Sequence, residues 1–196
     1  MSEFITIDTK ENVITTDKID PLPLFDDTLP LLHQVMPENK GPFPNAVLTK
    51  LAKQLSMTRK LYGGIGLSAN QCNVAERMFV IGTDDFEMVC INPKVVGVSE
   101  DEAFDKEGCL SFPGLSMRVK RPFTIQVEYQ NLDGKVVQQT LDGITARCYL
   151  HELDHMNGVV FTDRVGKTAL MMAKEKQKKL TKKYQRMKNN GLLFRS

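Results

Sequence analysis

The sequence predicts an α+β fold in which small antiparallel sheets pack around a central metal-binding helix, with a further helix at the C-terminus. Three observations lead to this prediction. Apolar residues recur at helical spacing before several short β-branched runs, an Asp-Gly pair joins two of these runs as in a hairpin, and two histidines stand four residues apart in a segment without Gly or Pro.

The composition is that of an ordinary folded domain. The chain has 196 residues, of which 41% are hydrophobic and 26% are charged. It contains no apolar run near the roughly 20 residues that span a bilayer, and its start lacks the pattern of a signal peptide. We therefore expect a cytoplasmic protein without a membrane segment, in which the four cysteines are free thiols.

The first predicted element is a helix that follows a Pro-rich entry. Asn45 can cap it, and Gly63-Gly64 can end it. Its apolar positions approximate a 3.6-residue period and are Val47, Leu48, Leu51, Leu55 and Leu61.

Strands and a second helix follow. Residues 77–82 and 88–93 are expected to be short strands, and residues 123–130 and 135–141 to form a hairpin around Asp133-Gly134. Residues 144–156 come after Gly143 and contain no Gly or Pro, which indicates a helix.

The second helix carries a candidate metal site. His151 and His155 share one helix face, and Glu152 lies beside them, as in H-E-x-x-H metal sites. The alternative is that both are ordinary helix residues. A third ligand could come from His33, which we interpret as a structural or surface residue, or from a carboxylate such as Asp163 or Glu175.

Cys109 is the better third candidate. It lies in the segment EGCLSFPG (107–114), where Gly108 and Pro113-Gly114 favour a loop. A free cysteine is more often a small buried residue. A second glycine-rich stretch, GGIGLSANQ (63–71), allows close approach of the backbone to another group, and it lacks the Gly-Lys-Ser/Thr ending of a phosphate loop.

Together these stretches resemble the peptide deformylase family. The motifs are GIGLSANQ (64–71), EGCLS (107–111) and HELDH (151–155), in the order and approximate spacing of that family. The resemblance extends over the intervening hairpin and NGVVFTDR, and so covers about residues 60–165.

The resemblance implies a complete catalytic set. Cys109, His151 and His155 would bind the metal and leave a fourth position open, and Glu152 would carry the proton. Gln71 and the backbone N–H of Leu110 would donate hydrogen bonds to the formyl oxygen. The Cys-His-His set suggests Zn²⁺ on general grounds, whereas the family implies Fe²⁺, replaceable by Zn²⁺, Ni²⁺ or Co²⁺.

The same alignment indicates where the substrate would lie. Gly64, Ile65 and Gly66 would form a backbone edge to which the peptide adds as a strand. Ile144, Arg147 and Cys148 would line a pocket for the methionine side chain.

Some positions depart from the family or have two interpretations. Ser68 stands where the family usually has alanine, and Leu150 where it commonly has glutamine. Glu107 and Arg121 are either a supporting ion pair or plain surface residues.

The C-terminal segment differs from the rest in charge. Residues 167–196 contain ten basic residues and one acidic residue, a charge of +9, so residues 1–166 carry −7 of the total of +2. We expect a catalytic domain over 1–166 and a basic helical tail over 167–196. The tail has a narrow apolar stripe and a stop at Gly191; the stripe is Leu170, Ala173, Leu180, Tyr184 and Met187.

The sequence thus predicts a metal-dependent hydrolase that removes the formyl group from N-formylmethionyl peptides of nascent proteins and releases formate. We expect a monomer. The basic tail could contact ribosomal RNA or remain a solvated helix. The alternative functions are an H-E-x-x-H metallopeptidase and a non-catalytic, metal-stabilised module that binds RNA or the ribosome.

Overall fold

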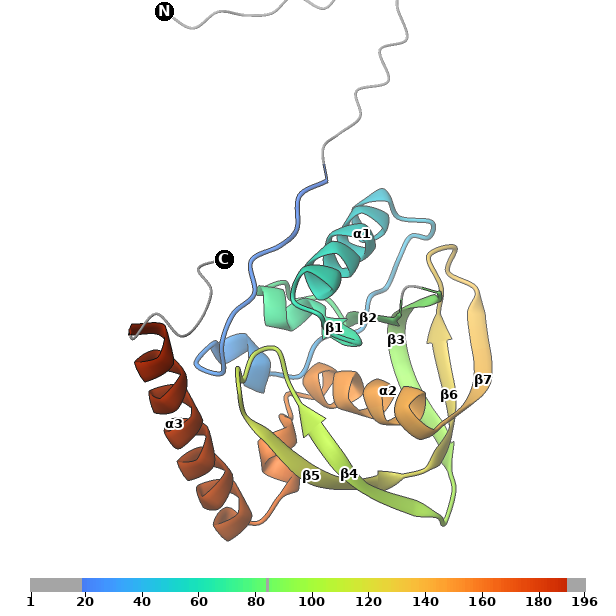
Figure 1. Ribbon diagram of the computed structural model, residues 1–196. Coiled ribbons are helices and arrows are strands. Elements are labelled where there is room, and N and C mark those ends of the chain that lie inside the picture. Colours follow the sequence, from blue (N-terminus) through green and yellow to red (C-terminus); the bar gives the residue numbers. More distant parts are fainter. Residues whose placement is uncertain (1–18, 84, 190–196) are drawn as a thin grey trace, which may run out of the picture.

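Two antiparallel sheets surround helix α2 (Gly143–Met156) in the computed structural model, which describes residues 19–83 and 85–189 (Figure 1). The larger sheet has the strand order β1-β2-β3-β6-β7, and the smaller one pairs β4 with β5. Their bounds are β1 Gly66–Ser68, β2 Met78–Gly82, β3 Glu87–Val98, β4 Glu102–Gly108, β5 Ser116–Pro122, β6 Thr124–Gln130 and β7 Val136–Asp142. The predicted α+β class is therefore confirmed.

Helix α1 (Ala46–Leu61) forms as its capping residue predicts. The side chain of Asn45 accepts hydrogen bonds from the backbone N–H groups of Val47 and Leu48. The predicted apolar face is wrong at its two ends, because Val47 and Leu61 are exposed. The buried face instead continues through Thr58 and Arg59, two polar residues that a hydrophobic pattern cannot assign to a core.

Three of the strands coincide closely with the prediction, a fourth is longer than predicted, and three were missed. The hairpin β6–β7 and the strand β2 begin and end within one residue of the expected ranges, whereas β3 runs five residues further. Strands β1, β4 and β5 were not predicted. β1 has three residues within a glycine-rich stretch, and β4 and β5 are rich in charged residues, so none contains the β-branched run typical of a strand.

Helix α2 is buried between the sheets on most of its surface. Its apolar face packs on β2, where the rings of Tyr149 and Phe79 meet edge to face with centroids 5.1 Å apart. Its polar face is buried as well and carries His151, Glu152 and His155. Buried polar groups require partners or a ligand, so this face is where a functional site is expected.

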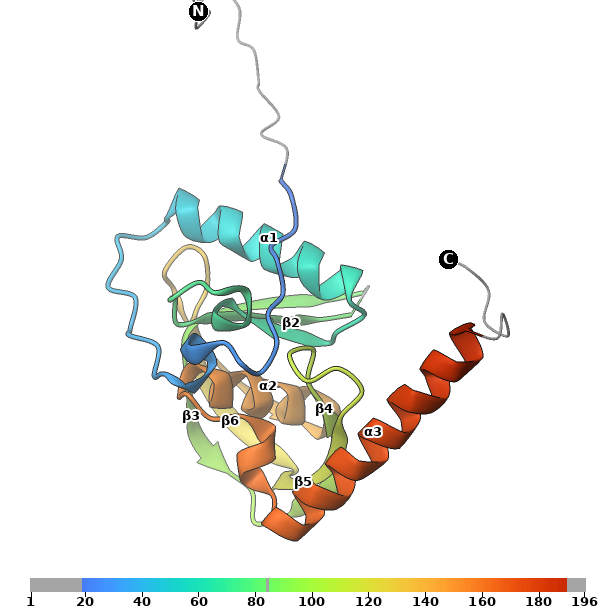
Figure 2. The same cartoon turned by 90° about the vertical axis from the view of Figure 1, so that its left-hand side faces the viewer.

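Helix α3 (Lys167–Asn189) lies to one side of the sheets (Figure 2). Leu170 and Ala173 pack against a core that includes Phe112 and Phe161. Further along, the Gln177 side chain donates a 2.7 Å hydrogen bond to the carbonyl of Pro113, whereas Leu180 is exposed. The predicted stripe is thus packed only over its first part.

The side chains of Tyr184 and Met187, and the predicted stop at Gly191, lie outside the described residues. Over the described part of the chain, no helix combines the length and the apolar character needed to cross a membrane.

Candidate metal centre and substrate cleft

Three side chains from distant parts of the sequence converge at one point. Cys109 follows directly after β4, and His151 and His155 stand one turn apart on α2. Their ligand atoms all lie within 4.8 Å of one another, and the Cys109 sulfur is 3.4 Å from Nε2 of His155. Both imidazoles are buried, and Cys109 is half-buried.

This donor set fits a divalent transition-metal ion. One thiolate and two imidazoles are ligands that zinc and iron(II) bind readily. Within the described residues the cluster has three members, whereas a closed structural site usually has four protein ligands. Next to it, the carboxylate Oε2 of Glu152 is buried without a protein partner among those residues. A buried carboxylate oxygen without a protein partner, beside three ligands, is consistent with an open position at which water or substrate is handled.

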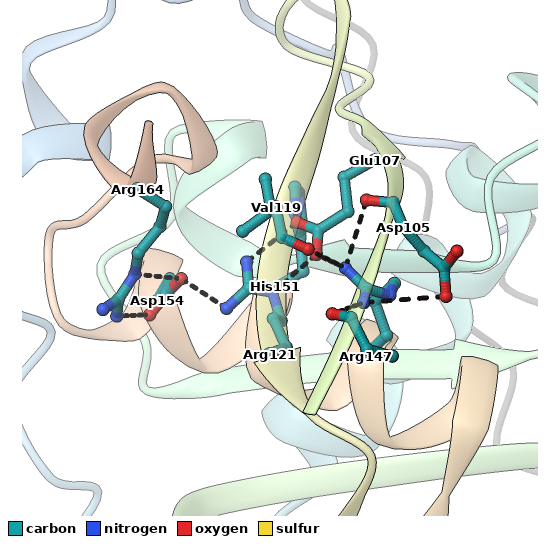
Figure 3. Close-up of polar contacts among 9 residues, drawn as sticks. Asp105, Glu107, Val119, Arg121, Arg147, His151, Asp154 and Arg164 are labelled. Carbon is teal, nitrogen blue, oxygen red and sulfur yellow. Dashed lines mark hydrogen bonds and ion pairs between the residues drawn. The ribbon is translucent and has the colours of Figure 1, made fainter. Parts of the chain in front are cut away.

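Glu107 orients the first histidine of the pair (Figure 3). Its Oε2 lies 3.2 Å from Nδ1 of His151, so that Nε2 of this ring remains free to face the cluster. The Glu107 carboxylate also accepts hydrogen bonds from Arg121 Nε and Arg147 Nη1, both at 2.6 Å. Of the two interpretations of Glu107 and Arg121, the structure therefore supports a buried ion pair rather than a surface contact.

The network continues along α2. Arg121 Nη1 donates a 2.9 Å hydrogen bond to Asp154, whose carboxylate also pairs with Arg164 (Figure 3). Asp154 therefore connects the helix with β5 and with the segment after the helix. A charged network of this kind holds the ligand-bearing turn in one orientation.

The burial and pairing of these groups change their protonation. Burial raises the pKa of Glu107, but hydrogen bonds from Arg121 and His151 outweigh burial and lower the pKa to about 2. Burial likewise lowers the pKa of His151, but hydrogen bonds with Cys109 and Glu107 raise it to about 10. Protons therefore compete with a metal ion for His151. At His155 burial dominates and lowers the pKa well below its ordinary value, which favours the neutral ligand form.

Glu152 lies beside the ligand candidates, and its carboxyl group has a raised pKa. Burial raises its pKa to about 7, although the charge on His151 opposes this shift. The carboxylate also lies against the backbone of Gly66, where a Cβ atom would be only 2.3 Å from Oε1. The glycine therefore allows the backbone to approach the acid closely.

Gln71 is held with its amide N–H₂ facing the ligands. Its Oε1 accepts hydrogen bonds from both the N–H and the hydroxyl of Ser68, each at 3.0 Å. Its Nε2 then lies 3.3 Å from the Cys109 sulfur and 3.1 Å from the hydroxyl of Ser111. Neighbouring Asn70 donates a 2.7 Å hydrogen bond to the carbonyl of His155. Ser111 and Asn70 belong to the motifs, but the sequence alone assigned them no contact.

A cleft of about 380 Å³ opens beside these residues. Glu152, Gln71, Cys109 and His151 are among the residues that line it. Leu110, whose backbone N–H is the second candidate donor, lines it too. So do the positions expected to bind substrate, namely Gly64, Ile65, Gly66, Ile144, Arg147 and Cys148. Ile144 and Ile65 are exposed, whereas the buried Arg147 guanidinium donates to Glu107 and to the carbonyls of Val119 and Ala103.

The other ligand candidates do not join the cluster. His33 is exposed, and its Nε2 lies 3.3 Å from the carbonyl of Asp27. Asp163 accepts a hydrogen bond from the backbone N–H of Val160, and Glu175 is exposed on α3.

Comparisons with known proteins agree with this geometry. The family model for polypeptide deformylase matches residues 21–170. A peptide deformylase of Thermotoga petrophila is 34% identical over 129 residues, which cover 66% of this chain and 79% of the relative. Peptide deformylase 2 of Gloeobacter violaceus is 41% identical over 126 residues, 62% of this chain and 67% of the relative.

Solved structures show the same fold. The crystal structure of peptide deformylase from Thermotoga maritima superposes with a TM-score of 0.71 at 31% identity and covers 74% of this chain and 98% of its own. The enzyme from Synechococcus elongatus, crystallised with actinonin, has a TM-score of 0.75 at 32% identity, over 90% of this chain and 93% of its own.

The matched range of 150 residues includes all three motifs and all three candidate metal ligands. A family model that matches most of the chain, a shared fold and a Cys-His-His cluster beside the cleft lead to one conclusion: this chain belongs to the polypeptide deformylase family.

Proposed function

We propose that this chain hydrolyses N-formylmethionyl peptides to free methionyl peptides and formate, with the residues of the cleft in the roles given below. The observation that carries the proposal is the convergence of Cys109, His151 and His155, with Glu152 and Gln71 lining the same cleft as Cys109 and His151. Family membership supports the reaction, and the geometry supports the assignment of roles.

The metal would be held by Cys109, His151 and His155. When bound, a divalent ion supplies Lewis acidity and lowers the pKa of water from about 15.7 toward about 7, so that a hydroxide is available at neutral pH. On the family resemblance we propose Fe²⁺ as the physiological ion, with Zn²⁺, Ni²⁺ or Co²⁺ as replacements.

Glu152 is the proton carrier in this proposal. Its carboxylate takes a proton from the attacking water and then delivers it to the nitrogen of the leaving amine. A pKa raised to about 7 by burial suits both transfers, because the group can bind and release a proton near neutral pH. General acid–base catalysis of this kind contributes about 10²–10⁴-fold.

Gln71 and the backbone N–H of Leu110 stabilise the negative oxygen that develops on the formyl carbon. The two hydrogen bonds from Ser68 hold the Gln71 amide with its N–H₂ toward the cleft, so the donor is already oriented before the substrate binds.

The peptide would pair with the free edge of the larger sheet. β1 is the first strand in that sheet and pairs with β2 on one side, and residues 64–66 line the cleft. An extended peptide can add to such an edge through main-chain hydrogen bonds. Ile144, Arg147 and Cys148 would then contact the methionine side chain.

The first test is formate release from formyl-Met-Ala-Ser by protein loaded anaerobically with Fe²⁺. We expect release by the native chain and its loss in Glu152→Ala at unchanged metal content. If the fully loaded native chain releases no formate, the proposal fails. Cleavage of unformylated peptides would then favour the metallopeptidase alternative, and absence of any hydrolysis would favour the RNA-binding alternative.

We also propose that residues 1–166 form the catalytic unit of a cytoplasmic monomer and that the tail 167–196 contacts the ribosome. The support is the charge of +9 on the tail and the exposure of Lys176, Lys179 and Lys183 on α3. Replacing these three lysines by Gln should weaken salt-sensitive co-sedimentation with ribosomes without altering hydrolysis of a free peptide. Truncation after Gly166 should abolish the co-sedimentation; unchanged sedimentation would contradict the proposal.

A further inference from the structure

Arg59 is a buried cation outside the cleft that contacts the backbone leading to its edge. It belongs to the last turn of α1 and is 2% exposed. A buried arginine is uncommon unless its charge and its donors are paired, so its partners indicate its role.

The Arg59 side chain contacts two backbone carbonyls and one carboxylate. One carbonyl belongs to the edge segment, residues 64–66, and the other to the end of β2. Arg59 Nη1 donates to the carbonyl of Gly64 at 3.0 Å and to that of Gly82 at 2.6 Å, and its Nη2 lies 3.3 Å from Glu87. The backbone repeats the connection, because the N–H of Gly64 donates to the carbonyl of Arg59 at 2.9 Å. Gly82 in turn donates its N–H to the carbonyl of Ile65 at 2.9 Å. One guanidinium thus joins the end of α1, the segment before β1 and the end of β2.

The position of this segment matters because it lies against the acid of the site. A Cβ atom on Gly66 would be 2.3 Å from Oε1 of Glu152 and 2.7 Å from the sulfur of Cys148. A movement of the edge by less than 1 Å would therefore change its distance from Glu152. The sheet holds β1 on one side, through β2, and Arg59 holds the residues that precede it.

We propose that Arg59 is a positioning residue, which fixes the backbone of residues 64–66 so that a bound peptide pairs with it in register with Glu152. This inference rests on the proposed function. Arg59 does not line the cleft and touches no reacting atom. Arg59 therefore affects substrate binding only through the position of residues 64–66. Its effect on kcat/KM should be larger for a substrate that has more peptide groups to pair with these residues.

The test compares a long and a short substrate in Arg59→Met. For formyl-Met-Ala-Ser we expect kcat/KM to fall about 10- to 100-fold, mainly through KM, because a displaced edge no longer pairs with the peptide. For formyl-methionine amide, which has no downstream residue, we expect a fall of less than about 3-fold. Arg59→Lys keeps the charge and a donor for one carbonyl, and should recover part of the loss for the tripeptide.

Methionine is a suitable replacement because it fills the buried volume without a charge, and the ionic partner left behind, Glu87, is partly exposed. Glu87→Gln is the matched control: it weakens the Nη2 contact but leaves both carbonyl contacts, and it should not alter the ratio of the two substrates. If Arg59→Met does not fold, the same ratio measured in Arg59→Lys decides the question.

The outcomes separate the two proposals. If the native chain releases no formate from either substrate, the proposed function fails. If the native chain is active and Arg59→Met loses the same factor on both substrates, the positioning role is refuted, because a general loss of folded protein would act equally on both. Unchanged activity of Arg59→Met on both substrates would refute it as well.

Discussion

Replacing Glu107 by glutamine should destabilise the chain and weaken its metal site together. Glu107 is the acceptor at which two buried arginines and one metal-ligand candidate meet. Glutamine has almost the same shape, so the change removes the charge and turns one acceptor into a donor, while the packing volume stays the same.

The structure sets the size of the effect. The side chains of Glu107, Arg121 and Arg147 are only 4–7% exposed, and removing one partner of a buried ion pair typically costs about 3–5 kcal/mol. In the variant, Arg121 still pairs with Asp154, and Arg147 still donates to the carbonyls of Val119 and Ala103. We therefore expect the free energy of unfolding to fall by about 3 kcal/mol, the lower end of this range. His151 also loses the acceptor at its Nδ1, which should lower metal affinity about 10- to 100-fold.

The assay is urea unfolding of the metal-free chain, followed by circular dichroism, together with chelator competition for metal affinity. Glu102→Gln is the matched control, since Glu102 lies on the same strand and pairs with Lys120, but both side chains are substantially exposed. The Glu102→Gln change should lower the free energy of unfolding by no more than about 1 kcal/mol and leave metal affinity unchanged. Equal destabilisation by the two variants would refute the reasoning that burial makes the Glu107 network strong.

Three further predictions concern pH, the amide donor and the close approach at β1. The pKa of Glu107 is about 2 in the folded chain against an ordinary 4.5, so its contribution to stability is present above pH 4.5 and is lost as the pH falls toward 2. The difference in unfolding free energy between the native chain and Glu107→Gln should therefore shrink by about 2 kcal/mol between pH 5 and pH 3; a constant difference would contradict this. Gln71→Ala should lower kcat about 10²- to 10³-fold at full metal occupancy, which steady-state formate release would measure; an unchanged kcat would remove Gln71 from the proposed oxyanion site. Gly66→Ala should lower kcat/KM by about 10²-fold, because its methyl group would overlap Glu152, whereas Gly166→Ala, with no atom within 4 Å of the added methyl, should have no effect. Equal activity of these two glycine variants would show that the edge can move away without loss.

Local patterns were sufficient for the elements whose stability is itself local. The cap at Asn45, the Asp133-Gly134 hairpin and the helix with His151 depend on neighbours within a few residues, and all three appear in the structure. The i, i+4 spacing also places His151 and His155 on one face of any helix, whatever surrounds it.

Other features depend on residues that are far apart in the sequence. Strands β4 and β5 are charged and gain their order by pairing with each other, so hydrophobic alternation could not reveal them. Glu107 could be a surface residue or a buried one until the fold placed Arg121, Arg147 and His151 around it. The burial of Arg59 is another case, because a charged residue in a helical pattern is normally assigned to the solvent face.

The sequence by itself therefore determined the candidate ligands, the acid beside two of them and the local elements that carry them, because these follow from residue type and short-range spacing. Only the tertiary structure decided that Cys109 meets the two histidines, that Glu107 orients one of them, and that the edge at Gly66 touches Glu152. Such contacts join segments about 40 to 90 residues apart, and their geometry is set by the packing of the two sheets on α2, which no local pattern encodes.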